Sequence, residues 1–190
     1  MSEYRILAFS GSLRDGSFNK KLLAIAVDGA LEAGAKVTLI DLRDYPLPIY
    51  DGDLEVREGI PENARRLQAL LETHHGLLIA TPENNYSLSA VLKNTIDWVS
   101  RPIDDYPSRH YFKGKTAALV SAAGTLGGKF GMTHLRHIFN AFQILVIPEE
   151  YGVVFAFREV DENGNFNDEH VAPAKAVGAR LAEVIKQIHG

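Results

Sequence analysis

Short apolar runs recur along the chain at intervals that suit a regular alternation of strands and helices. Each run is continuous, whereas a strand with one solvated face would alternate apolar and polar residues. Continuous runs are typical of strands in a parallel sheet that is covered on both faces. The runs span residues 6–9, 37–40, 77–80, 117–120 and 144–147. This pattern predicts five buried strands.

Helical patterns fill the intervals between these runs. Residues 19–34 place apolar side chains on one face and end at a glycine, and residues 61–74 begin with a proline suited to a first helical turn. From residue 168 onward, apolar residues at steps of three and four form a single stripe, which comprises Val171, Ala174, Val177, Leu181, Val184 and Ile188. The alternation predicts a doubly wound α/β sheet with right-handed crossovers.

The size of the chain predicts one domain. Its 190 residues are enough for a sizeable core but are few for two domains, so we expect residues 1–190 to form a single domain. The sequence is 46% hydrophobic and 23% charged, which is ordinary for a globular protein and leaves little scope for extended disorder.

Charge and cysteine content exclude several classes of function. With 20 Lys and Arg against 24 Asp and Glu, the net charge of -4 offers no broad basic surface, so we expect no nucleic-acid partner. The absence of cysteine excludes disulfides, thiolate metal sites and cysteine nucleophiles. The apolar interval around Ile6 is too short for a signal peptide and no run suits a membrane span, so we expect a cytoplasmic protein.

Three loops are the expected place for a ligand. In doubly wound sheets ligands bind beyond the carboxyl ends of the strands, where the direction of winding reverses. The loops that follow the first, third and fourth predicted strands are SGSLRDGSFN at 10–19, TPENNYSLSA at 81–90 and SAAGTLGGKFG at 121–131.

The first of these loops has the character of an anion site. It joins a strand to a helix, so free backbone N–H groups and the positive end of the helix dipole converge there. Short polar side chains and one arginine add donors, namely Ser10, Ser12, Arg14, Ser17 and Asn19. The alternative is that Gly11 and Gly16 only form the turn while Ser17 or Asn19 caps the helix.

Exclusion narrows the choice of phosphate ligand. The loop lacks the Lys-Ser or Lys-Thr ending of a nucleoside-triphosphate loop, and its glycines are not spaced for a dinucleotide. A phosphatase with the same loop would need a cysteine. Flavin mononucleotide (FMN), which carries one terminal phosphate, fits what remains.

Two motifs together resemble a known family. GSLRDGSFN and the later TPENNYSLSAVLKNTIDWVSR are similar to segments of the NADPH-dependent FMN reductases of the flavodoxin-like superfamily, a group that includes quinone, azo-dye and chromate reductases. The segments SAAGTLGG and HLR are similar as well, so the resemblance spans most of the chain. It implies a flavodoxin-like five-stranded parallel sheet, in the order 2-1-3-4-5, with helices on both faces.

The resemblance also implies roles for individual residues. The five donors of the first loop would hold the FMN phosphate, and Ser121 and Gly124 would close one side of the pocket. The residues that would line the isoalloxazine ring are Pro82, Glu83, Asn84, Asn85 and Tyr86. A loop led by proline suits this role, because its backbone N–H groups can reach the edge of the flavin where reduction builds negative charge. The alternative is that the second loop is a helix entry capped by Ser87 or Ser89.

The chain departs from the family pattern at two places. Asn84 stands where the family usually has the tyrosine of Pro-Glu-Tyr-Asn, and Ser89-Ala90 stands where Pro-Gly is common. Loss of the aromatic ring predicts weaker flavin binding or a more open site.

The expected function is that of an oxidoreductase in which bound FMN carries the chemistry. NADPH or NADH would supply hydride, and the acceptor would be a quinone, an azo compound, a metal oxyanion or free flavin. No side chain is assigned as a catalytic residue and none as a metal ligand. A flavodoxin-like electron-transfer protein and a flavin-free binding or regulatory protein remain alternatives. By resemblance, we expect a homodimer or a dimer of dimers.

Overall fold

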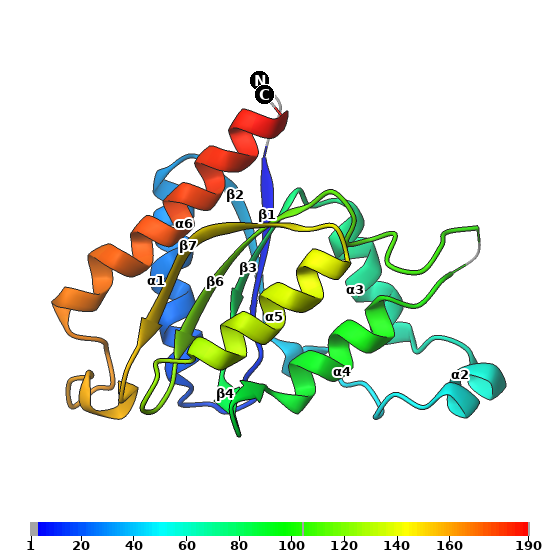
Figure 1. The fold of residues 1–190 in the computed structure, drawn as a ribbon, viewed down its shortest axis with the longest axis horizontal. Helices are drawn as coiled ribbons and strands as arrows, with labels where there is room; N and C mark the ends of the chain where they lie inside the picture. Colours follow the sequence, from blue (N-terminus) through cyan, green and yellow to red (C-terminus); the bar gives the residue numbers. More distant parts are fainter. Residues whose placement is uncertain (1–3, 104, 190) are drawn as a thin grey trace.

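The computed structural model describes residues 4–103 and 105–189 and is built on a five-stranded parallel sheet (Figure 1). The order of the strands is β2-β1-β3-β6-β7, which is 2-1-3-4-5 when only these long strands are numbered. The strands are β1 (Arg5–Ser10), β2 (Lys36–Ile40), β3 (Gly76–Ala80), β6 (Thr116–Ala122) and β7 (Leu145–Val153). The predicted strand order is therefore confirmed.

Helices cover both faces of the sheet, as predicted (Figure 1). On one face, α1 (Phe18–Glu32) and α6 (Asp168–His189) pack together over the strands. The other face is covered by α3 (Glu62–Glu72), α4 (Ala90–Val99) and α5 (Lys129–Ala141). Successive strand residues point to opposite faces, so β1 sends Ile6 and Ala8 toward α1 and α6, and Leu7 and Phe9 toward the other layer.

Smaller elements complete the fold. The remaining ones are the 3-10 helices η1 (Leu42–Asp44) and η2 (Ala156–Arg158), the short helix α2 (Gly52–Glu58), and a hairpin of β4 (Glu83–Asn84) and β5 (Ser87–Leu88). Helix α2 has no buried residue and projects from the body of the molecule (Figure 1). Its sequence is polar, which explains why the pattern of apolar residues does not predict it.

The last strand is longer than its apolar run predicts. The run ends at residue 147, whereas β7 continues through Pro148 and two glutamates to Val153. β7 lies at the edge of the sheet, where a proline without an N–H is tolerated. Its pairing with β6 shifts register between Ala117 and Leu119, so the strand bends without leaving the sheet.

Backbone hydrogen bonds hold the carboxyl ends of the strands together. Gly11 N–H donates to the carbonyl of Ala80 at 2.9 Å, and Thr81 N–H donates to the carbonyl of Val120 at 3.0 Å. The loops after β1, β3 and β6 therefore start side by side at one edge of the sheet, where the sequence places the candidate site. Among the helices of the described ranges, none has the length and apolarity that a membrane span requires.

Candidate functional site

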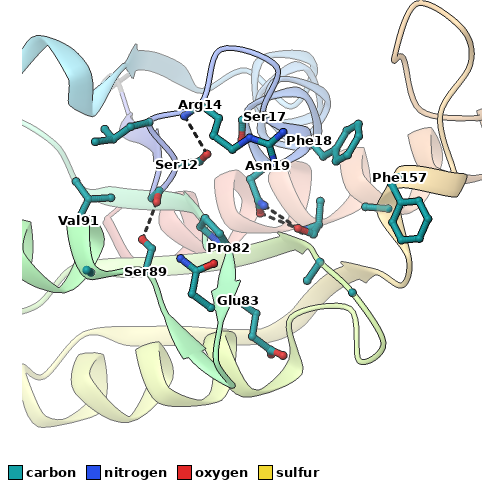
Figure 2. A pocket seen from close by; sticks show the side chains of 18 residues that line it. Ser12, Arg14, Ser17, Phe18, Asn19, Pro82, Glu83, Ser89, Val91 and Phe157 are labelled. Atoms are coloured by element: carbon teal, nitrogen blue, oxygen red, sulfur yellow. Dashed lines mark hydrogen bonds between the residues drawn. The ribbon is translucent and has the colours of Figure 1, made fainter.

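A pocket of about 510 Å³ opens at this edge, and the three predicted loops line most of it (Figure 2). A volume of this size suits a cofactor. Eight of the twelve predicted site residues line it, namely Ser12, Arg14, Ser17, Asn19, Pro82, Glu83, Asn84 and Gly124. The structure thus brings together residues that lie more than a hundred positions apart in the sequence, and their contact with a flavin stays a prediction.

The start of α1 supplies the polar side of the pocket. Ser17 is the N-cap, and its Oγ accepts a hydrogen bond from Lys20 N–H. The alternative interpretation of the loop offered Ser17 or Asn19 as the cap; the cap is Ser17, which also lines the pocket. The first turn of a helix leaves N–H groups that lack partners within the helix, so this side favours an anion.

Arg14 is the cation of the first loop. Its side chain is exposed, and its backbone N–H donates to Ser12 Oγ at 3.4 Å. Asp15, its neighbour in the sequence, forms an ion pair with Arg43 and so does not neutralise Arg14. Asp41 in turn pairs with Lys20 at 2.6 Å and with Arg43 at 2.8 Å.

The pKa of Asp41 reflects these neighbours. Partial burial alone would raise the pKa of this carboxyl, but hydrogen bonds from Arg43 and Lys20 outweigh burial and hold it well below its usual range. Asp41 is therefore a carboxylate at neutral pH. Lys20 and Arg43 balance Asp41 and Asp15, and among the described residues that line the pocket Arg14 is the one cation.

The side chain of Asn19 is hydrogen-bonded to the backbone at the end of β6. Its Nδ2 donates to the carbonyl of Ala122 at 2.7 Å, and its Oδ1 accepts from the N–H of Ala122 at 3.0 Å. This buried amide clamp fixes the start of α1 to the end of β6, as Figure 2 shows. Asn19 thus lines the pocket while both ends of its side chain are already bonded.

Ser89 ties the second loop to the first. Its Oγ donates to the carbonyl of Gly11 at 2.6 Å and accepts from Leu92 N–H, so Ser89 caps α4. A Cβ at Gly11 would lie 3.0 Å from both Ser89 Oγ and Leu92 Cβ, so little room remains there for a larger residue. The helix-entry interpretation of the second loop is correct for Ser89, which also lines the pocket.

Some of the residues predicted to line the flavin ring lie in the pocket, and others lie outside it in the turn of the β4–β5 hairpin. Pro82 and Asn84 line the pocket, but Asn85 and Tyr86 form the exposed turn and do not. Both turn residues have positive φ, at 49° and 61°, which suits a tight two-residue hairpin. The ring of Tyr86 packs edge-on against Phe130 at 5.7 Å between centroids.

Glu83 turns its carboxylate toward α5. Its Oε2 accepts hydrogen bonds from Phe130 N–H at 2.8 Å and Gly131 N–H at 3.1 Å. Because the N-cap of α5, Gly128, has no side chain, Glu83 supplies the cap and its negative charge complements the helix dipole. Figure 2 shows this side chain pointing away from Pro82.

Ser10 and Ser121 lie outside the pocket wall. Ser121 Oγ is buried and donates to the carbonyl of Thr81 at 2.6 Å. This hydrogen bond ties the end of β6 to the start of the second loop. Ser10 lines a neighbouring pocket of about 370 Å³ beside Lys20 and Asp41. Within the described part of the chain, no hydrogen-bond partner accompanies the buried Ser10 Oγ.

Sequence reasoning missed several apolar residues of the pocket. They are Leu13, Phe18, Val91, Ala156 and Phe157. Phe18 adjoins the predicted donors, so its position was a usable signal. Ala156 and Phe157 follow β7, outside the three loops that the winding rule selects, and no motif marked them. Figure 2 shows the rings of Phe18 and Phe157 at one end of the pocket and Val91 at the other.

A second cluster of polar groups lies at the start of α6. Ligand atoms of Glu159, Glu169 and His170 lie within 4.8 Å of one another. Both ring nitrogens of His170 are already bonded, to Tyr151 Oη at 2.8 Å and to Glu159 Oε2 at 3.1 Å. This cluster braces the segment between β7 and α6, and it does not line the pocket.

Comparison with known proteins identifies relatives along most of the chain. Residues 4–158 match the family described as NADPH-dependent FMN reductase. The NADPH:quinone oxidoreductase of Arabidopsis thaliana is 35% identical over 170 residues, which cover 87% of this chain and 83% of the relative. The NAD(P)H-dependent FMN reductase of Pseudomonas aeruginosa is 40% identical over 135 residues, which cover 70% of this chain and 68% of the relative.

Comparison with solved structures finds the same kind of protein as comparison of sequences. The flavoenzyme NAD(P)H:(acceptor) oxidoreductase FerB from Paracoccus denitrificans superposes with a TM-score of 0.78 at 25% identity, over 97% of this chain and 98% of that chain. Solved structures that include flavodoxins share the same architecture at lower identity, which confirms the flavodoxin-like fold.

Proposed function

This chain belongs to the NADPH-dependent FMN reductase family, and on that premise we propose that its main pocket holds FMN and serves an NAD(P)H-dependent reductase whose acceptor is a quinone. The observation that carries the proposal is the composition of the pocket, which joins a donor-rich helix start to loops with planar and apolar residues. The named activities of the relatives support the choice of a quinone.

The residues present fit FMN. The ligand has a phosphate dianion at one end and a planar ring at the other, and the pocket has donors on one side and apolar groups at its ends. Ser12, Arg14 and Ser17 would hold the phosphate together with the backbone N–H groups of the first turn of α1. Pro82, Asn84 and Gly124 would line the ring, since they follow the neighbouring strands β3 and β6.

Three of the remaining predicted residues have positioning roles in this proposal. Asn19 and Ser121 bind backbone groups of the loops, and Glu83 joins the hairpin to α5. These contacts keep the loop backbones fixed before a ligand arrives, which lowers the cost of ordering them on binding.

Bound FMN would supply the two-electron chemistry, accepting hydride from the nicotinamide and passing reducing equivalents to the acceptor. The protein itself would grip the phosphate, orient the ring and exclude water from one face. We place no side chain in the role of nucleophile or metal ligand. NADPH and NADH are both candidate donors, with the family description favouring NADPH.

A flavodoxin-type electron carrier is the second candidate. Carriers of that kind usually present a strongly acidic docking face. The charges beside this pocket are of mixed sign, with Lys20 and Arg43 facing Asp41 and Asp15. This arrangement favours the reductase over the carrier.

Steady-state kinetics test the reductase directly. FMN-loaded protein should oxidise NADPH in the presence of duroquinone, with parallel double-reciprocal lines, because donor and acceptor would use the same pocket in turn. The absence of NADPH oxidation at any quinone concentration would favour the electron carrier. Failure to bind FMN would favour a flavin-free member of the family.

We also propose that the chain forms one domain, that it works in the cytoplasm and that it assembles as a homodimer or a dimer of dimers. Exposed apolar side chains next to the pocket support assembly, among them Tyr86 at 68% exposure and Phe130 at 41%. Light scattering coupled to size exclusion measures the mass, and a monomer at micromolar concentration would contradict the assembly.

A further inference from the structure

Phe157 presents an apolar ring at the rim of the pocket. It is 59% exposed, the most exposed of the large hydrophobic residues that line this pocket. Single exposed hydrophobic residues are common on protein surfaces. What distinguishes Phe157 is its place on the pocket rim together with the contacts that hold it there.

The backbone beside Phe157 is fixed. Phe155 N–H donates to the carbonyl of Gly124 at 2.9 Å, and Ala156 N–H donates to the carbonyl of Ala123 at 3.0 Å. Phe155 has φ of 45°, in the left-handed region that bulky residues rarely adopt. A strained residue held by its surroundings is often found at a binding site, and here it lies two residues before Phe157.

The ring itself is also held. The guanidinium of Arg158 lies 5.2 Å from the centroid of the Phe157 ring and 4.9 Å from that of Phe155. The two rings meet edge to face at 6.2 Å. Arg158 and Phe155 therefore support the Phe157 ring, which stays more than half exposed at one end of the pocket (Figure 2).

Phe157 comes from a different part of the fold than the residues expected to anchor the cofactor. Those residues follow β1, β3 and β6, whereas Phe157 follows β7 at the edge of the sheet. At its end of the pocket the neighbouring ring is Phe18, which is backed edge-on by Phe166 at 6.3 Å. A rim of two aromatic rings, one of them more than half exposed, suits a planar apolar ligand that enters and leaves.

We propose that Phe157 is a specificity-determining residue that contacts the ring of the quinone acceptor and favours quinones over small inorganic acceptors. This inference rests on the proposed function, because it assumes that an acceptor binds in the same pocket. Duroquinone is a suitable probe, since its ring is planar and fully substituted. The chain also has no cysteine thiol to add to a quinone.

The test compares Phe157→Ala with two matched variants in FMN-loaded protein. Phe157→Tyr keeps an aromatic ring, and Val154→Ala removes apolar surface from an exposed neighbour that does not line the pocket. Equilibrium dialysis of the oxidised protein gives the Kd of duroquinone without turnover. Steady-state assays give the KM of duroquinone and of ferricyanide, and titration of the apoprotein gives the Kd of FMN.

We expect Phe157→Ala to weaken duroquinone binding roughly five- to tenfold, because it loses one aromatic contact. The KM of duroquinone should rise in parallel, with the KM of ferricyanide and the Kd of FMN unchanged. Phe157→Tyr and Val154→Ala should behave as the wild type. An unchanged Kd of duroquinone in Phe157→Ala would overturn the inference, as would an equal rise in the Kd of FMN, which would assign the ring to the cofactor.

These measurements distinguish a wrong role for Phe157 from a wrong proposed function. If the wild type reduces duroquinone and Phe157→Ala does so equally well, only the specificity role is wrong. If the wild type binds no FMN, or binds it and is not reduced by NADPH, the proposed function is wrong and the specificity role falls with it.

Discussion

At the scale of single residues, Arg14 carries the strongest expectation about ligand binding. It is the exposed cation of the first loop, and the neighbouring carboxylate of Asp15 is engaged by Arg43. Its guanidinium is therefore available to a phosphate, for which its fork of donors is well suited.

Replacement of the Arg14 side chain should weaken the binding of a flavin that has a phosphate and leave the binding of one without it unchanged. Arg14→Ala should weaken FMN binding by about 1.5–3 kcal/mol, roughly 10- to 150-fold, through loss of a charge-assisted hydrogen bond. Riboflavin, which lacks the phosphate, should bind wild type and variant equally. Fluorescence titration measures both affinities, and an unchanged Kd of FMN would place the phosphate elsewhere.

The sequence predicts the roles of some of these residues and not of others. The donors of the first loop were recognisable because four short polar side chains and an arginine stand together between a predicted strand and a predicted helix. The orientation of Glu83 and Ser121 was not, because each bonds to a backbone group that is distant in the sequence. Phe157 has no motif around it, and only the folded chain brings it to the pocket.

At the scale of elements, the packing of α1 against α6 depends on two glycines. A Cβ added at Gly178 would lie 1.8 Å from the carbonyl oxygen of Ala26, and one at Gly29 would lie 2.1 Å from that of Lys175. The backbones of the two helices are therefore too close for any side chain at these positions. Because α1 begins in the first loop, this contact also supports the pocket.

Gly178→Ala should therefore destabilise the protein, although alanine is the better helix former. We expect a loss of about 1–3 kcal/mol in the free energy of unfolding, because the helices must move apart. Gly52→Ala is the matched control, since Gly52 starts the exposed helix α2 and its Cβ would meet nothing closer than 3.9 Å. Urea denaturation compares the two, and equal midpoints would show that the helices adjust without cost.

The elements that bury an apolar face could be predicted from the sequence, whereas the small or exposed ones could not. The five strands and the two long amphipathic helices at residues 19–34 and 168 onward have strong apolar patterns, and all are present. The hairpin of β4 and β5 was not predicted, because each strand has two residues and its turn uses Asn85 and Tyr86 in place of a glycine pair. The apolar run stops before the end of β7 because an edge strand tolerates Pro148 and the two glutamates in its middle.

At the scale of the whole molecule, two histidines, His74 and His75, should make the free energy of unfolding depend on pH. Burial is the main cause that lowers the pKa of both His74 and His75, and nearby cations such as Lys115 lower it further. His75 Nδ1 accepts a hydrogen bond from Arg5 N–H, which requires that nitrogen to be unprotonated. The folded protein therefore favours neutral rings.

The sign of the effect follows from proton uptake on unfolding. In the unfolded chain these histidines titrate near their ordinary pKa of 6.5, above the lowered values of the folded state. Between the folded and unfolded pKa values the unfolded state binds more protons, so stability should fall as the pH is lowered below about 6.5. Urea midpoints at pH 7.5 and pH 5.5 measure this, and a higher midpoint at pH 5.5 would contradict it. His75→Gln should reduce the difference.

An anaerobic titration shows what the whole molecule does with FMN. Purified protein is loaded with FMN, freed of excess and titrated with NADPH in the absence of oxygen while the absorbance of the bound flavin is followed. We expect the flavin absorbance to bleach and added duroquinone to restore it. Bound flavin that stays oxidised in excess NADPH would contradict the assignment as an NADPH-dependent reductase.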